Sequence, residues 1–200
     1  LGHAGFAIKF ANLLFYADPC LTTPEGRSRI AEAPLNPREA PAPDMILCTH
    51  PHAGHMDPNT LEGLLQSSTP QCKIVMPKSA ANHAHALGIP YERMTTTDSG
   101  LRVEYFKDGL YGRVYSTPSA HPEILWDPIG GHAHLGYLIR FERVTIYHAG
   151  DCAMYPDIAA RLKPYNVNVA LLPIGGGNFA PSEAAQLAED IGARWIVPMH

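Results

Sequence analysis

The sequence lacks long apolar runs and is poor in charge. Only 17% of its 200 residues are charged and the net charge is −4, so it has no excess of the basic residues that a nucleic-acid surface requires. No apolar run approaches the roughly 18 residues that cross a bilayer. The start shows no basic segment followed by an apolar one, as a signal peptide would. We therefore expect a small-molecule partner, and neither a nucleic acid nor a membrane.

Cysteine is scarce as well. The chain has four cysteines, and their spacing shows no pairing pattern, which favours free thiols in a reducing compartment, the cytoplasm. Hydrophobic residues make up 46% of the chain, enough for a single domain over residues 1–200. The chain begins without methionine and ends directly after an apolar run, so we expect a domain cut at both ends from a longer protein. Assembly into a homo-oligomer stays open.

Apolar periodicity and turn signals predict a mixture of strands and helices. Residues 19–44 and 122–136 show no periodicity and are expected to be irregular. Helices are expected at 58–65, 79–87, 157–162 and 183–191, the last capped by Ser182. Strands are expected at 6–10, 12–16, 45–48, 73–76, 137–141, 144–147, 167–172 and 195–197, and as a hairpin within 101–116 that turns at Asp108-Gly109.

Three histidines lie within six residues, directly after the apolar run 45–48. Side chains alternate along an extended segment, so His50 and His52 can point to the same side. Gly54 lets the backbone turn and bring His55 back toward them. Imidazole is a common ligand of divalent transition metals. Solvated loop histidines are the alternative, but three such residues seldom gather by chance at one strand end.

Three further strand-like runs are each followed by a residue that can bind a metal, namely His121, Asp151 and His200. Residues distant in sequence can meet in one cleft when they follow strand ends. Together with the three histidines above, they make six ligands. That number fits a pair of metals that share the carboxylate of Asp151, with a position on each left open for water.

Five motifs in order resemble the metallo-β-lactamase superfamily over essentially all 200 residues. They are Leu1-Gly2-His3-Ala4-Gly5-Phe6 with Asp18-Pro19, then His50, His52 and His55, then His121, then Tyr147-His148-Ala149-Gly150-Asp151, and last Val197-Pro198-Met199-His200. The fourth motif, with Ile89-Pro90-Tyr91-Glu92-Arg93, is similar to the L-ascorbate 6-phosphate lactonase branch. The resemblance implies an α/β (α+β) fold, a four-layer αββα sandwich with metals at the edge between its two sheets.

The resemblance also implies a metal-dependent hydrolase that opens a lactone or ester of a small polar sugar acid, with or without a phosphate, by a metal-bound hydroxide. The cofactor would be Zn²⁺ or Mn²⁺, one or two per chain. Asp151 would be catalytic, bridging the metals or orienting the nucleophile. The expected metal ligands are His50, His52, His55, His121, Asp151 and His200, and the expected substrate contacts are His3, His132, His134 and His148.

One position departs from the family pattern. Gly54 stands where the family has an aspartate that binds the second metal, so that metal is expected to bind more weakly. Asp57 is either a substitute ligand or the N-cap of the following helix, and Pro58 after it favours the cap. Two other functions stay open: a catalytically silent relative that binds a metal or ligand, and a phosphodiesterase.

Overall fold

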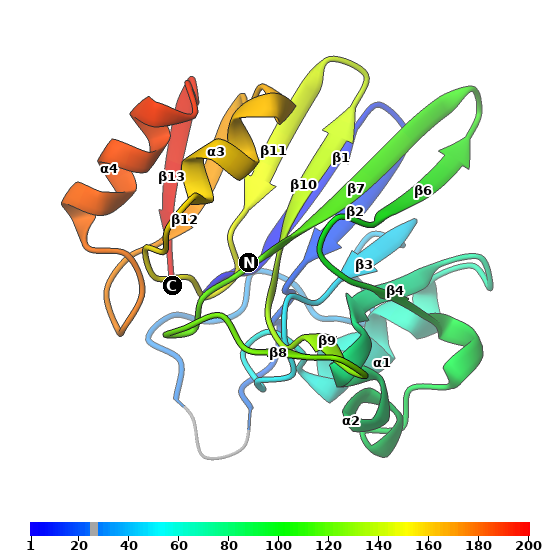
Figure 1. Ribbon diagram of the computed structural model, residues 1–200. Coiled ribbons are helices and arrows are strands. Elements are labelled where there is room, and N and C mark those ends of the chain that lie inside the picture. Colours follow the sequence, from blue (N-terminus) through cyan, green and yellow to red (C-terminus); the bar gives the residue numbers. More distant parts are fainter. Residues whose placement is uncertain (25–27) are drawn as a thin grey trace. The chain divides into compact units, whose positions relative to one another are not determined.

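The computed structural model describes residues 1–24 and 28–200. The chain divides into two compact units, Leu1–Thr96 and Thr97–His200. Each unit contains one main sheet with its own helices (Figure 1). Among the described residues, no helix has the length and apolar character needed to cross a membrane.

The sheet of the first unit has five strands in the order β1-β2-β3-β4-β5. β1 pairs with β2 antiparallel, whereas β2, β3 and β4 run parallel. The start of β1 and the carboxyl ends of β2 and β3 therefore lie at one edge of this sheet. The strands are β1 (Phe6–Phe10), β2 (Leu13–Ala17), β3 (Met45–Leu47), β4 (Lys73–Pro77) and β5 (Met94–Thr97).

Two helices belong to the first unit, α1 (Pro58–Ser67) and α2 (Ala81–Ala86). The predicted N-cap of α1 is confirmed: the Asp57 carboxylate accepts the backbone N–H of Thr60 at 3.0 Å. Leu61 and Leu64 of α1 are buried in one cluster with Ile46 and Ile74 of the sheet, so the apolar face of the helix covers the strands. Short 3₁₀ turns precede α2 at Lys78–Ala80 and precede β5 at Tyr91–Arg93.

The sheet of the second unit has six strands in the order β13-β12-β11-β10-β7-β6. β10 is antiparallel to both β7 and β11, and β11, β12 and β13 are parallel. β7, β11 and β13 therefore run in the same direction and end at the same edge. The strands, with a separate hairpin β8–β9, are β6 (Arg102–Lys107), β7 (Leu110–Pro118), β8 (Trp126–Asp127), β9 (Gly131–His132), β10 (Leu135–Phe141), β11 (Val144–His148), β12 (Val169–Pro173) and β13 (Trp195–Met199).

Helices α3 (Ile158–Leu162) and α4 (Pro181–Asp190) lie over one face of this sheet (Figure 1). A 3₁₀ turn, Lys163–Tyr165, follows α3. Ile158 of α3 and Leu187 of α4 are buried with Leu138 of β10 in one core. Burial of such side chains contributes about 1.5–3 kcal/mol each to folding.

Three sequence-based expectations need correction. Ser182 does not cap α4, because Pro181 already occupies the first helical position and the backbone N–H of Ala180 donates to Glu183 Oε2 at 2.8 Å. Residues 122–136 are not wholly irregular, since they contain the hairpin β8–β9 and the start of β10. The predicted elements also omit β5, whose Met-Thr-Thr-Thr sequence carries no clear alternation.

Candidate metal centre

His50 and His52 present ring nitrogens to one another at the sheet edge of the first unit. His50 Nε2 lies 2.9 Å from His52 Nδ1, and the ring of His50 is fully buried. Two nitrogens each about 2.0–2.1 Å from one tetrahedral metal would lie about 3.3 Å apart. The pair is therefore within a few tenths of an ångström of the spacing that one ion needs, and these donors fit a divalent metal.

Asp18, which belongs to the first sequence motif but was not predicted to have a role at the site, organises this edge. It follows β2, is fully buried, and accepts the backbone N–H and the hydroxyl of Thr49, each at 2.7 Å. It also accepts His55 Nδ1 at 2.7 Å. Its carboxylate therefore orients the His55 ring. The signal in the sequence is an acidic residue directly after a strand whose carboxyl end meets that of β3.

The same contacts assign the tautomers of two rings. The Thr49 hydroxyl donates to Asp18, so its oxygen accepts His50 Nδ1–H at 3.0 Å. His55 donates its own Nδ1–H to Asp18. In both rings Nε2 is therefore the nitrogen that would bind a metal, with Nδ1 held by a neighbour.

His3 lies beside this group. It stands in the turn before β1, and its ring packs edge-on against that of His55 with centroids 4.9 Å apart. Its side chain is exposed. The structure thus places a predicted substrate contact next to a predicted metal ligand.

His121, Asp151 and His200 meet at the sheet edge of the second unit. His200 Nε2 lies 3.3 Å from Asp151 Oδ1, and His121 Nε2 lies 3.7 Å from Asp151 Oδ2. The carboxylate is 6% exposed, and the two imidazoles are 22% and 24% exposed. One buried carboxylate flanked by two more open imidazoles is a donor set suited to a divalent transition metal.

Ser119 joins the two loops that carry His121 and Asp151. Its hydroxyl is buried within hydrogen-bond distance of the carbonyls of Ala149, at 2.9 Å, and Asp151, at 2.8 Å. The backbone N–H of Ala153 donates to Ala120 at 2.7 Å. The loop after β7, which carries His121, is thereby tied to the loop after β11, which carries Asp151.

Two of the predicted substrate contacts also lie in the second unit. His132 donates its backbone N–H to Asp98 at 3.1 Å, and its Nδ1 lies 2.7 Å from the same carboxylate. Burial alone would raise the pKa of Asp98, but these bonds and the Ser99 N–H lower it below its ordinary value. His134 packs edge-on against His121 with ring centroids 5.3 Å apart.

His148 is fully buried, and its Nδ1 accepts the backbone N–H of Gly150 at 3.2 Å. It therefore shapes the turn that leads to Asp151, and its burial gives substrate contact no support. The thiols nearest the candidate ligands are buried too. Burial raises the pKa of Cys48 well above its usual value and that of Cys152 to about 11, so both thiols are protonated at neutral pH.

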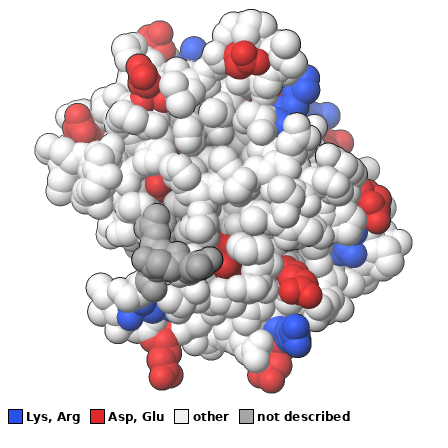
Figure 2. All heavy atoms as spheres, turned by 90° about the horizontal axis from the view of Figure 1, so that it is seen from below, with Lys and Arg blue, Asp and Glu red and all other residues white. Residues whose placement is uncertain are grey.

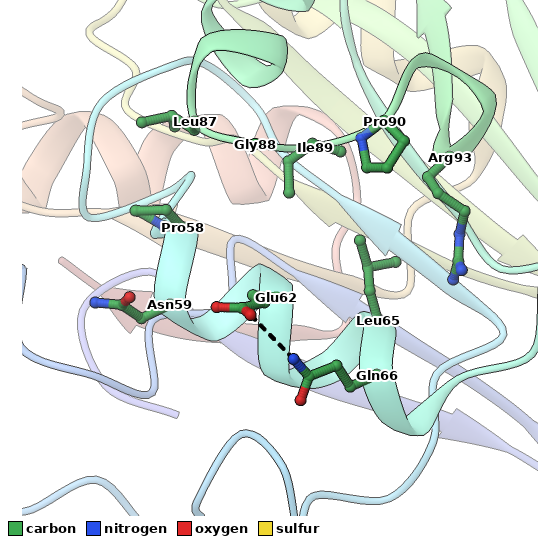
Figure 3. A pocket seen from close by; sticks show the side chains of 10 residues that line it. All are labelled: Pro58, Asn59, Glu62, Leu65, Gln66, Leu87, Gly88, Ile89, Pro90 and Arg93. Carbon is green, nitrogen blue, oxygen red and sulfur yellow. Dashed lines mark hydrogen bonds between the residues drawn. The ribbon is translucent and has the colours of Figure 1, made fainter.

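A separate cavity of about 520 Å³ lies in the first unit between α1 and residues 87–93 (Figure 3). No histidine lines it. Glu62 bonds to Gln66 at 3.0 Å, and the Arg93 guanidinium bonds to Ser68 Oγ and to the carbonyls of Cys72 and Thr69. Glu62, Gln66 and Arg93 are thus held by neighbours within the protein, and the cavity contains none of the candidate metal ligands.

Comparison with known proteins identifies the family of this chain. Residues 1–200 match the family described as "Beta-lactamase superfamily domain". The chain therefore belongs to the β-lactamase superfamily, and the predicted metallo-β-lactamase fold class is confirmed. Within it, the chain belongs to the UPF0173 metal-dependent hydrolase family.

Relatives in that family support the assignment over most of their length. The chain is 34% identical over 205 residues to the UPF0173 metal-dependent hydrolase of Methanoculleus marisnigri, covering 100% of this chain and 78% of that protein. The homologue from Methanoregula boonei is 32% identical over 165 residues, with coverage of 79% and 66%. The fold is similar to that of Igni18, a metallo hydrolase from Ignicoccus hospitalis, with a TM-score of 0.71, 23% identity and coverage of 100% and 79%.

Proposed function

We propose that this chain hydrolyses an ester bond, with lactones of small polar sugar acids as the substrate class. The proposed metal ligands are His50, His52, His55, His121, Asp151 and His200. The observation that carries the proposal is the pair His50 Nε2 and His52 Nδ1, which face each other at 2.9 Å. Membership of the metal-dependent hydrolase family supports it independently.

A divalent metal, when bound, supplies a Lewis acid and lowers the pKa of coordinated water from 15.7 to about 7. Imidazole and carboxylate donors suit Zn²⁺, and the carboxylate also suits Mn²⁺. Thr49 and Asp18 accept the Nδ1–H groups of His50 and His55, so Nε2 is the nitrogen that each ring would present to a metal. These two rings are therefore oriented before a metal binds.

Asp151 is the proposed catalytic residue. Its two carboxylate oxygens face His200 and His121, so its orientation is fixed from both sides. A carboxylate held this way can orient a water molecule and accept its proton as that water attacks an ester carbonyl. Ser119, through its contact with the Asp151 carbonyl, holds the backbone from which this carboxylate projects.

We assign recognition of a polar substrate to His132 and His134, with His3 as a further candidate. The Asp98 carboxylate holds Nδ1 of His132, which leaves Nε2 of this 18% exposed ring to meet a hydroxyl or phosphate oxygen. On the face drawn in Figure 2, basic side chains stand apart and alternate with acidic ones. This scatter supports a small-molecule substrate over a polyanion. The four cysteines are buried and form no disulfide within the described part of the chain, which supports our proposal of a cytoplasmic protein.

The test combines metal analysis with a substrate screen. Purified protein, His52→Ala and His121→Ala are compared for bound zinc and manganese and for turnover of lactones, simple esters and phosphodiesters. We expect both variants to lose metal and lactone turnover together, while the exposed His83→Ala retains both. Full metal content in either ligand variant would refute the ligand set. Turnover of phosphodiesters alone would replace the substrate class, and metal binding without turnover would indicate a silent relative.

A further inference from the structure

We propose that His3 is a metal ligand, which pairs with His55 to hold a second ion. We also propose that position 54 is glycine because the His3 ring occupies the space beside it. The inference rests on the proposed function, since it takes a metal centre at this edge as given. It changes the assignment of His3 from substrate contact to ligand, and it assigns a substitute for the carboxylate missing at position 54.

The backbone sets the position of His3. Gly5 N–H donates to Gly2 O at 2.9 Å, which closes a tight turn with His3 at its first central position. His3 adopts a φ of 52°, in the left-handed region that costs a non-glycine residue conformational energy. The turn also packs on Asp18, because a Cβ on Gly5 would lie 2.9 Å from the Asp18 carbonyl oxygen. The residue that orients His55 therefore also supports the turn that presents His3.

Gly54 leaves room for this ring. A Cβ added at Gly54 would lie 3.0 Å from Cε1 of His3 and 3.2 Å from its Nδ1. The φ of Gly54 lies outside the left-handed region, so its backbone conformation does not require glycine. What a side chain would disturb is the His3 imidazole. We therefore attribute the glycine to contact with His3.

The two rings form a donor pair. A ring nitrogen of His3 lies within 4.8 Å of one of His55. His55 Nδ1 is held by Asp18, so its Nε2 is the donor that remains. An ion shared by the two rings would hold these nitrogens roughly 3.3 Å apart.

A second ion here would lie close to the first. The ring of His55 packs against that of His50 with centroids 4.0 Å apart. His50 with His52, and His3 with His55, are therefore adjacent imidazole pairs within Leu1–Thr96. Two-metal hydrolytic sites place their ions about 3.5–4 Å apart. A second site built from imidazoles should also prefer Zn²⁺ to Mn²⁺, which favours oxygen ligands.

The experiment titrates metal-free protein with Zn²⁺ by calorimetry, comparing the unaltered chain with His3→Ala, Gly54→Ala and the double variant His3→Ala/Gly54→Asp. We expect two zinc ions in the unaltered chain and in the control His83→Ala. We expect one in His3→Ala and in Gly54→Ala, whose methyl group displaces the ring without offering a ligand. The double variant should regain the second ion, because a carboxylate then takes the place of the imidazole.

Failure of the His3 inference and failure of the proposed function would give different results. Two zinc ions in His3→Ala would overturn the role of His3 and leave the proposed function intact, whereas no zinc in the unaltered chain would overturn both. A second experiment uses only the unaltered chain, so it still tests the inference if a variant does not fold. The ring ¹⁵N resonances of His3 should shift during zinc titration together with those of His55. Unshifted His3 resonances beside shifted His50 resonances would refute the inference.

Discussion

The two units prepare their ligands in different ways. In Leu1–Thr96, His50 and His55 are 0% and 1% exposed, and the second nitrogen of each ring is bonded to Thr49 or Asp18. In Thr97–His200, His121 and His200 are 24% and 22% exposed and lie around one carboxylate. His50 and His55 are thus fixed by hydrogen bonds to Nδ1, although His52 of the same unit is exposed. The residues of the second set are placed by the ends of three strands.

This difference has a functional consequence. Donors whose tautomer and orientation are set in advance bind a metal with little reorganisation, and the partners that set them typically contribute 10–100-fold to affinity. We therefore expect the first set to govern metal affinity. The more open set around Asp151 is expected to govern turnover, because it has room for water and substrate.

The largest effect on stability and metal content is expected from Asp18→Ala. It leaves the Thr49 N–H, the Thr49 hydroxyl and the His55 Nδ1–H without their acceptor, in a fully buried place. Each such loss costs about 1–3 kcal/mol, so we expect about 3 kcal/mol or more in denaturant unfolding and nearly complete loss of metal.

A matched control is Asp44→Ala. Asp44 is also buried, and it accepts the backbone N–H of Leu14 at 2.9 Å, but it lies outside the histidine group. It should lose stability and keep its metal once folded. Equal metal loss in both variants would mean that the effect of Asp18 is general instability.

The next effect is expected from Thr49→Val. It keeps the shape of the side chain and removes the hydroxyl that joins Asp18 to His50. Metal affinity should fall about 10-fold or more, with a stability loss of about 1 kcal/mol. Competition with a chromophoric chelator measures the affinity. An unchanged affinity would show that the tautomer of His50 does not depend on Thr49.

Ser119→Ala tests the second unit, in which the Asp151 carboxylate is expected to govern turnover. Its hydroxyl contacts the carbonyls of Ala149 and Asp151, so its loss should loosen the loop that carries the carboxylate. We expect kcat to fall several-fold while metal content stays near that of the unaltered chain. The account would fail here if metal content fell as much as in Thr49→Val.

The smallest effect is expected from Asp98→Asn, which weakens the contact with His132. Because folding lowers the pKa of Asp98, its stabilising contribution is present above the ordinary value of 3.8 and is lost as pH falls through the lowered folded value. The stability difference from the unaltered chain should therefore be about 1 kcal/mol near neutral pH and vanish in acid. Thermal unfolding at several pH values measures it. A difference that grows in acid would contradict this sign.

Local patterns predicted much of the fold, and they indicated His50, His52 and His55 as candidate ligands. Asp57-Pro58 indicated the start of α1, and apolar runs located β3 and β12 to within a few residues. The role of Asp18 could not be seen, because it depends on β2 pairing with β3 across about 30 intervening residues. The close approach of the His3 ring to Gly54 could not be seen either, because the two residues are 51 positions apart in the chain.

The most direct test of the central claim is X-ray absorption spectroscopy at the zinc edge of the zinc-loaded protein. Imidazole ligands predict a nitrogen and oxygen shell at about 2.0–2.1 Å, with the outer-shell scattering of imidazole carbons, and His50→Ala should weaken that scattering. A shell at about 2.3 Å would indicate cysteine sulfur instead. Either that shell, or the absence of imidazole scattering from bound zinc, would contradict a metal centre built from these histidines.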